Sequence, residues 1–115
     1  NDLATRDQAI TDARTQWERV VAASAVHYLN VALNHPDDLA VYAHGLSEGV
    51  AFIYSLKFNP SRTLSLAEID QLLVLTGGSS DFSQMNLYQV TPEDLQTAKN
   101  TIVETFGFES VADQL

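Results

Sequence analysis

The most constraining feature of the sequence is an uninterrupted stretch from residue 4 to about residue 34 that contains neither glycine nor proline. Within it, side chains of one stripe recur at steps of three and four residues, which is the period of one helix face. This stripe consists of Ile10, Ala13, Trp17, Val20, Val21, Ser24, Tyr28 and Val31. The first half is charged on its other faces, whereas residues 20–33 are apolar on almost every face. The pattern predicts one long helix that runs from the surface into the centre of a helical bundle.

Three further helices are predicted after this one. Pro36 ends the first helix, because proline disfavours helical geometry in the residue before it. The later helices begin at residues that cap helix N-termini: Asp37 or Asp38 for the second, Ser65 with Glu68 for the third, and Thr91 before Pro92 for the fourth. The four expected helices span about 4–34, 38–58, 65–76 and 91–106, with a loop at 77–90.

These elements predict an all-α fold, an antiparallel helical bundle of about four helices in a single domain over residues 1–115. Two segments are apolar on more faces than the three other helices of the bundle can easily cover. They are the second half of the first helix and the run VAFIYSL of the second. We therefore expect further helices to pack against them. The chain opens with Asn1 rather than methionine, as both mature secreted chains and excised fragments do.

The charge balance narrows the class of partner. The 115 residues include 15 acidic and 6 basic side chains, a formal net charge of −9. Such a chain repels phosphate backbones and anionic lipid, so we expect no nucleic-acid partner. No apolar run is long enough to cross a bilayer, and no direct membrane insertion is expected. Without cysteine, the chain forms no disulfide, thiolate metal site or cysteine nucleophile.

His44 and Glu48 form the candidate site of the sequence. They stand four residues apart on the second expected helix, so their side chains share one face. A histidine and a carboxylate at this spacing can supply half of a zinc or iron site, which needs at least one further ligand. The same spacing also fits an ordinary hydrogen bond in a polar seam. We expect His27 to be buried, neutral and hydrogen-bonded to a neighbouring helix, and His35 to be exposed.

No catalytic set accompanies this pair. No serine occurs in a G-x-S-x-G setting, and no glycine-rich phosphate loop is present. Residues 81–86 lack the ligands of a calcium loop, since Met85 replaces an oxygen donor and no closing glutamate follows. Six aromatic residues at helical spacing are expected in the core: Trp17, Tyr28, Tyr42, Phe52, Tyr54 and Phe58. We expect a protein that is not an enzyme and holds no cofactor, with a divalent metal at His44 and Glu48 as the alternative.

A family resemblance covers nearly the whole chain. It rests on three blocks in this order: ARTQWERVVAASAVHYLNVAL, HGLSEGVAFIYSLKFNPSRTLSLAEIDQLL and LYQVTPEDLQTAKNTIVETFGF. They resemble the C-terminal half of a bacterial domain-of-unknown-function family with an LSE-x-x-x-FIYSLKFNP core. That family is distantly similar to imelysin-like proteins, which are all-helical envelope proteins, often lipoproteins, linked with iron uptake or a proposed metallopeptidase activity.

The resemblance implies an extracytoplasmic location, periplasmic or associated with the outer membrane of a bacterium. Because members of that family run longer on the N-terminal side, it also implies that this chain is a fragment of a longer chain. The fragment would then pack against the remaining N-terminal helices of the family domain. The imelysin-type motif G-x-H-x-x-E is not matched, because His44 and Glu48 are one residue further apart and no glycine stands two residues before His44. The metal ligands of that motif therefore do not transfer to this pair.

Two functions follow as expectations. The first is a non-catalytic helical binding or interaction domain of a bacterial cell-envelope protein, linked to iron or nutrient uptake, whose partner is a protein or a small ligand. The alternative is a metal-binding or metallopeptidase-like site at His44 and Glu48. A third ligand-type side chain beside this pair would favour the alternative.

Overall fold

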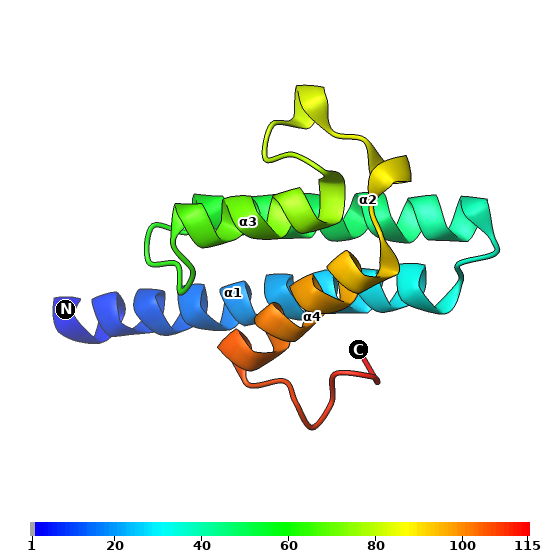
Figure 1. The fold of residues 1–115 in the computed structure, drawn as a ribbon. Helices are drawn as coiled ribbons and strands as arrows, with labels where there is room; N and C mark the ends of the chain where they lie inside the picture. Colours follow the sequence, from blue (N-terminus) through cyan, green and yellow to red (C-terminus); the bar gives the residue numbers. More distant parts are fainter. Residues whose placement is uncertain (1) are drawn as a thin grey trace.

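The computed structural model describes residues 2–115, and this part of the chain contains four α-helices, three short 3₁₀ turns and no β-strand (Figure 1). The α-helices are α1 (Leu3–Asn34), α2 (Leu39–Ser55), α3 (Leu66–Gly77) and α4 (Pro92–Phe106). The 3₁₀ turns are η1 (Leu56–Phe58), η2 (Phe82–Gln84) and η3 (Leu87–Gln89). The prediction of an all-α bundle of about four helices is confirmed, and each helix lies within a few residues of its expected range.

The ends of α3 and α4 follow from local chemistry. The Ser65 side chain accepts a hydrogen bond from the Glu68 backbone, and the Glu68 carboxylate accepts one from the Ser65 backbone, so both groups of the predicted capping box are present. Thr91 caps α4 in the same way. The residues that follow the two helices are Gly78 and Gly107, whose backbones are left-handed with φ of 78° and 70°. Only glycine adopts this conformation without a steric penalty.

Helix α2 is shorter than predicted. Asp38 caps its start by accepting a hydrogen bond from the Val41 N–H, and His35 in the preceding turn is exposed, as expected. The helix ends at Ser55, and the chain tightens into η1 before Asn59 becomes extended. Pro60 explains this ending, because a residue before proline is driven away from helical geometry.

Helices α1 and α2 form an antiparallel hairpin with very close contact. A Cβ atom added to Gly45 would lie 2.9 Å from Val31 Cγ1 and 3.1 Å from the Ala32 backbone nitrogen. Gly49, one turn further along α2, packs against the Leu29 side chain. The two glycines therefore allow the helix backbones to approach where larger residues would separate them.

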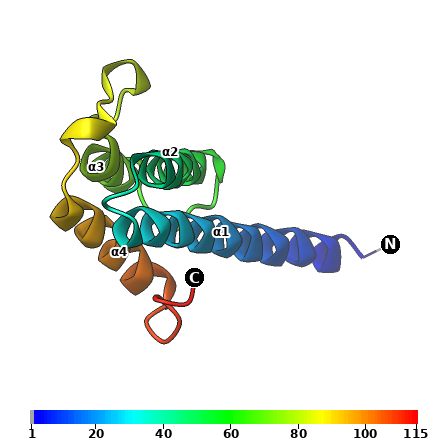
Figure 2. The same ribbon diagram turned by 90° about the vertical axis from the view of Figure 1, so that its right-hand side faces the viewer.

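Helices α3 and α4 complete the core. Helix α3 runs back along α2, and α4 crosses α1 obliquely (Figures 1 and 2). The largest fully buried apolar side chains come from all four helices: Leu29, Val26, Leu46, Ile53, Ile69, Leu72, Leu73, Leu95 and Ile102. After α4 the tail returns to α1, where Asn30 donates hydrogen bonds to the Ala112 and Leu115 carbonyls. The buried Lys99 of α4 forms an ion pair with Asp113 of the same tail at 2.6 Å.

The core face of α1 differs from the stripe that the spacing picked out. Trp17 is 70% exposed and Val20 is 54% exposed, whereas the buried residues of α1 include Ala25 and Leu29. The reason is length: α1 has 32 residues and α2 has 17, so the first half of α1 extends past every other helix (Figure 2). Residues 2–17 are all exposed. The prediction that this helix runs from the surface into the bundle is confirmed, but the expected core position of Trp17 is wrong.

Candidate functional site

Helix α2 presents His44 and Glu48, the pair that the sequence singled out. His44 is exposed and Glu48 is half-buried. The Ser47 hydroxyl between them donates a hydrogen bond to the His44 carbonyl. Over residues 2–115, no group of three or more His, Cys, Asp or Glu side chains lies close enough together to hold a metal ion. The metal site at His44 and Glu48 stays a prediction.

Tyr28 of α1 contacts both helical histidines. The centroid of its ring lies 5.0 Å from that of His27 and 6.1 Å from that of His44, and both contacts are edge-on. Its ring also stacks on Phe52 at 5.6 Å. His27 is exposed, so the expectation of a buried histidine is wrong. The reason is its position on α1, since the buried face of this helix is the one that carries Leu29.

A groove lies between α1 and the end of α2. Its volume is about 650 Å³. The apolar lining comprises Ala13, Trp17, Val21, Leu56, Phe58 and Pro60, and the polar lining comprises Arg14, Glu18, Ser55 and Asn59. Trp17 and Phe58 are each 70% exposed, on opposite walls, so the expected core position of Phe58 is wrong as well. Two large aromatic side chains thus face solvent at one groove.

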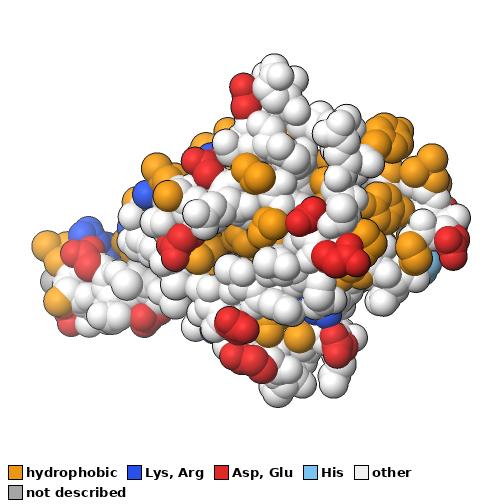
Figure 3. Space-filling model, in the orientation of Figure 1, with side chains coloured by type: hydrophobic (Ala, Val, Ile, Leu, Met, Phe, Trp, Pro, Cys, Tyr) orange, Lys and Arg blue, Asp and Glu red, His pale blue; other side chains and the backbone are white. Residues whose placement is uncertain are grey.

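The groove continues into an exposed apolar stripe along the first half of α1. This stripe consists of Leu3, Ile10, Ala13, Trp17 and Val20. We call the stripe and the adjoining groove the α1 surface. In Figure 3, hydrophobic side chains reach the surface at the N-terminal end of the long helix, interspersed with charged ones. Exposed apolar patches of this kind mark interaction sites in soluble proteins.

The two charged residues of the groove differ in their environment. Glu18 is only 5% exposed, and its carboxylate accepts hydrogen bonds from the backbone N–H and the hydroxyl of Thr63. Arg14 is exposed and, among residues 2–115, its guanidinium forms neither a hydrogen bond nor an ion pair. Glu18 therefore holds the loop after η1 in place, while Arg14 is free to pair with an incoming carboxylate.

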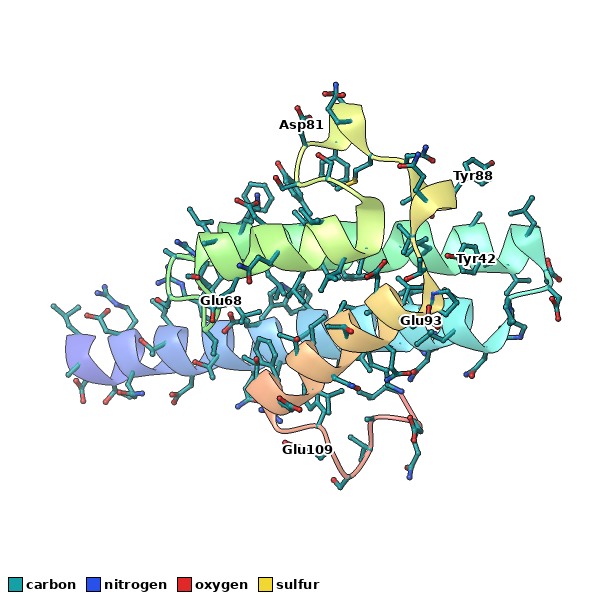
Figure 4. The ribbon with its side chains drawn as sticks, in the orientation of Figure 1. Tyr42, Glu68, Asp81, Tyr88, Glu93 and Glu109 are labelled. Atoms are coloured by element: carbon teal, nitrogen blue, oxygen red, sulfur yellow. The ribbon has the colours of Figure 1, made fainter. Side chains whose placement is uncertain are left out.

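The basic side chains gather at this end of the molecule. Residues 2–19 and 57–62 carry five of the six basic residues but only four of the fifteen acidic ones. The rest of the chain is strongly acidic and includes Glu93 on α4 and Glu109 in the tail, both of which are exposed (labelled in Figure 4). The α1 surface is thus close to neutral, in a chain whose net charge is −9.

A second, smaller hollow of about 260 Å³ lies near the start of α2. Tyr42 of α2 and Tyr88 of η3 line it, and Tyr88 projects away from the helices (Figure 4). Burial raises the pKa of Tyr42 above its ordinary value. No charged side chain lines this hollow. It therefore offers no acid–base pair of the kind that a catalytic site requires.

Sequence reasoning missed the groove because its walls are far apart in the chain. Residues 13–21 form one wall and residues 55–60 the other. Periodicity indicates which residues share a helix face, but it does not indicate where a partner helix stops. One sequence feature could have indicated the groove: Trp17 is a large aromatic residue within the charged half of the first helix.

No helix in residues 2–115 is both long and apolar enough to cross a membrane, in agreement with the expectation that the chain does not insert directly into one.

Residues 1–109 match one family model, described as a domain of unknown function, DUF4856. No curated protein and no solved structure matched the chain. Because the family model matches nearly the whole sequence, the chain belongs to the DUF4856 family.

Proposed function

We propose that this chain is a non-catalytic helical interaction domain that binds another protein through the α1 surface. The observation that carries this proposal is the exposure of Trp17 and Phe58 on opposite walls of one apolar groove. Aromatic side chains are enriched in the buried centres of protein interfaces, where they contribute a large share of the binding energy. The adjoining stripe on α1 enlarges the apolar area that a partner would cover.

The family resemblance supports the same surface. The string FIYSLKFNP, residues 52–60, is the part of the sequence on which the resemblance is most specific, and it supplies the groove wall that contains Leu56, Phe58 and Pro60. We further propose that the domain acts in the bacterial cell envelope, periplasmic or at the outer membrane, in iron or nutrient uptake. The resemblance to imelysin-like envelope proteins supports this location and role.

A designed peptide tests the interaction role. The probe is an amphipathic helical peptide with leucine at the first and fourth positions of each heptad, and a scrambled peptide of identical composition serves as its control. Trp17 is the only tryptophan of the chain, so its fluorescence reports on the groove directly. We expect the amphipathic peptide alone to move the Trp17 emission to shorter wavelength in a saturable way.

Two variants locate the binding. Phe58→Ala removes the exposed aromatic ring from one groove wall. It is expected to lower the affinity for the peptide roughly tenfold, because a large aromatic contact is lost. Leu66→Ala removes an exposed apolar side chain of α3 outside the groove and should leave the affinity unchanged. An emission that does not respond to the amphipathic peptide, or that responds equally to the scrambled one, would overturn the proposed role.

The alternative function is a divalent-metal site at His44 and Glu48. It is favoured by their spacing on one face of α2, where His44 is open to solvent. Elemental analysis together with thermal unfolding, with and without a chelator, tests it, because a metal that binds only the folded state raises its stability. Stoichiometric metal that disappears in His44→Ala would replace the interaction role as the leading function.

A further inference from the structure

We propose that the partner of the α1 surface is a second copy of this chain, packed antiparallel along the first half of α1. This inference rests on the interaction role proposed above and names the partner. The surface is an unpaired helix face over residues 2–17, all of which are exposed. Self-pairing is favoured by three properties of this face: its spacing, its charge pattern and its position relative to the acidic remainder of the molecule.

The spacing of the stripe is that of a helix which packs against another helix. Leu3, Ile10 and Trp17 are seven residues apart, and Ala13 and Val20 follow the last two after three residues. This pattern corresponds to the first and fourth positions of a heptad repeat, which form the seam of two packed helices. From Leu3 to Val20 the seam is about 26 Å long at 1.5 Å per residue.

An antiparallel pair fits this seam to itself. When Ile10 lies beside the partner's Ala13, Leu3 lies beside the partner's Val20. In this register Arg6, the polar member of the seam, lies beside the partner's Trp17. A guanidinium over an indole face is a favourable cation–π contact.

The same register brings opposite charges together. Asp7 and Arg14 occupy one flank of the seam, and both are exposed. Within one copy Asp7 pairs with the adjacent Arg6 at 2.6 Å, and this exposed pair would break when Asp7 turns to the partner. In the antiparallel pair, Asp7 lies within about 3 Å, measured along the helix axis, of the level of the partner's Arg14. Arg14 has no ion-pair partner among residues 2–115, so the second copy supplies the missing carboxylate. The two-fold symmetry forms this ion pair twice.

The shape of the molecule also favours this arrangement. The first half of α1 extends away from the acidic remainder (Figures 1 and 2). When two such extensions lie side by side and antiparallel, the two acidic bodies lie at opposite ends of the pair. Repulsion between them is reduced, since screening weakens charge interactions beyond about 10 Å. The first helical turn of each copy then lies at the edge of the other copy's groove, where Leu3 is level with the partner's Val20 and Arg6 with the partner's Trp17.

Sedimentation equilibrium of the intact chain tests the proposal, with the Trp17 emission recorded over the same concentrations. We expect the mass to rise from one chain to two, and the emission to move to shorter wavelength over the same range. A mass of one chain at every concentration would overturn the proposal. A dimer that forms without a shift in the Trp17 emission would also overturn it, because such a dimer would use another surface.

Substitutions on α1 test the geometry. Ile10→Glu places a charge in the seam and should weaken association roughly tenfold or more, because an unpaired buried charge is costly. Thr15→Glu is the matched control: Thr15 is exposed on another face of α1, and its hydroxyl bonds only the Thr11 carbonyl. The control should leave association unchanged. Circular dichroism establishes that both variants keep the helical fold.

A charge exchange tests the antiparallel register. Asp7→Arg alone and Arg14→Asp alone should each weaken association, because each brings like charges together. The double variant restores opposite charges only if the two positions face each other across the pair, so it should recover most of the original affinity. A double variant weaker than either single variant would overturn the antiparallel pair.

The outcomes separate this inference from the interaction role on which it rests. A chain that stays monomeric but whose Trp17 responds to the amphipathic peptide overturns the second copy as partner and leaves the interaction role. In that case another protein, or another segment of the family domain, covers the α1 surface. A chain that neither associates nor responds to the peptide overturns both.

Discussion

The Glu18 carboxylate joins the long helix to the loop after η1 by accepting two hydrogen bonds from Thr63, one from the backbone N–H at 2.7 Å and one from the hydroxyl at 2.9 Å. Glu18 is nearly fully buried and lines the groove. A buried carboxylate without hydrogen-bond donors would destabilise the folded state, and Thr63 supplies two such donors. This contact fixes one wall of the groove relative to the other.

Glu18→Ala is therefore expected to lower the free energy of unfolding by about 1–3 kcal/mol, because it leaves the Thr63 groups without their acceptor. Glu18→Gln keeps one acceptor oxygen and should cost less. Asp12→Ala serves as the matched control, since Asp12 lies on the exposed half of the same helix. Denaturant unfolding measures all three variants. A cost for Glu18→Ala no larger than that of Asp12→Ala would show that the contact does not hold the loop.

The two glycines of α2 predict different responses to alanine. In Gly45→Ala the new Cβ would lie 3.1 Å from the Ala32 backbone nitrogen of α1. A backbone atom cannot move away without shifting the whole helix. We expect a loss of about 1–3 kcal/mol of stability. In Gly49→Ala the nearest atom is Leu29 Cδ2 at 3.2 Å, the end of a flexible side chain. Because alanine favours the helix by about 1 kcal/mol over glycine, this variant should be close to neutral.

The melting temperatures of the two variants provide the comparison. A Gly45→Ala variant as stable as Gly49→Ala would contradict the close approach of α1 and α2. The substitutions are chemically identical and lie on the same helix, so the intrinsic preference of alanine for a helix cancels between them.

The C-terminal tail is expected to loosen in acid. The Lys99 ammonium, which hydrogen-bonds Asp113, lowers the pKa of that carboxyl below its ordinary value of 3.8. A carboxyl whose pKa is lower in the folded state stabilises that state above the unfolded pKa, and this contribution is lost as the pH falls through the folded pKa. The Asp113 contact should therefore hold near neutrality and weaken as the pH falls below about 4, while the Asn30 hydrogen bonds to the tail remain.

Hydrogen exchange of the tail amides, such as Val111, which donates to the Phe108 carbonyl, reports this change. Asp113→Asn should lower the protection of the tail amides at neutral pH, measured relative to the intrinsic exchange rate at each pH, and should remove the dependence of that protection on acid. Asp37→Asn removes an exposed carboxyl elsewhere and should not change tail exchange. Tail exchange that responds to acid equally in the parent chain and in Asp113→Asn would assign the effect to other carboxyl groups.

The position of the core predicts a contrast within α1. Leu29 is fully buried, so Leu29→Ala should cost about 2–5 kcal/mol. Ile10 belongs to the stripe that the spacing picked out but is 43% exposed. In dilute solution, Ile10→Ala should change the stability by no more than about 0.5 kcal/mol. Equal losses in chemical unfolding would mean that the isolated chain already covers the stripe.

The sequence was sufficient for the helices because their limits are set locally. The Ser65 capping box, the cap at Thr91 and the break at Pro60 each depend on a few adjacent residues, and all three form as expected. The class of fold followed from the same signals. Each of these interactions joins residues that are close together in the sequence, so they can be predicted from the sequence alone.

The core face of α1 and the groove could not be found in this way. Both depend on where α2 ends relative to α1, which is a tertiary property. The three-and-four spacing correctly placed Ile10 and Trp17 on one face but could not show that this half of α1 lacks a partner over residues 2–115. The prediction that His27 is buried was wrong for the same reason, because the positions of α2 and α4 decide which face of α1 is buried.

The first half of α1 carries an apolar face that the rest of residues 2–115 leaves exposed. Hydrogen exchange along α1 in dilute solution measures this. We expect much faster exchange over residues 6–17 than over residues 22–33, because backbone hydrogen bonds without tertiary packing open readily. We also expect slower exchange over residues 6–17 once a partner is bound. Equal, strong protection of both halves in the dilute monomer would contradict the exposure of this face.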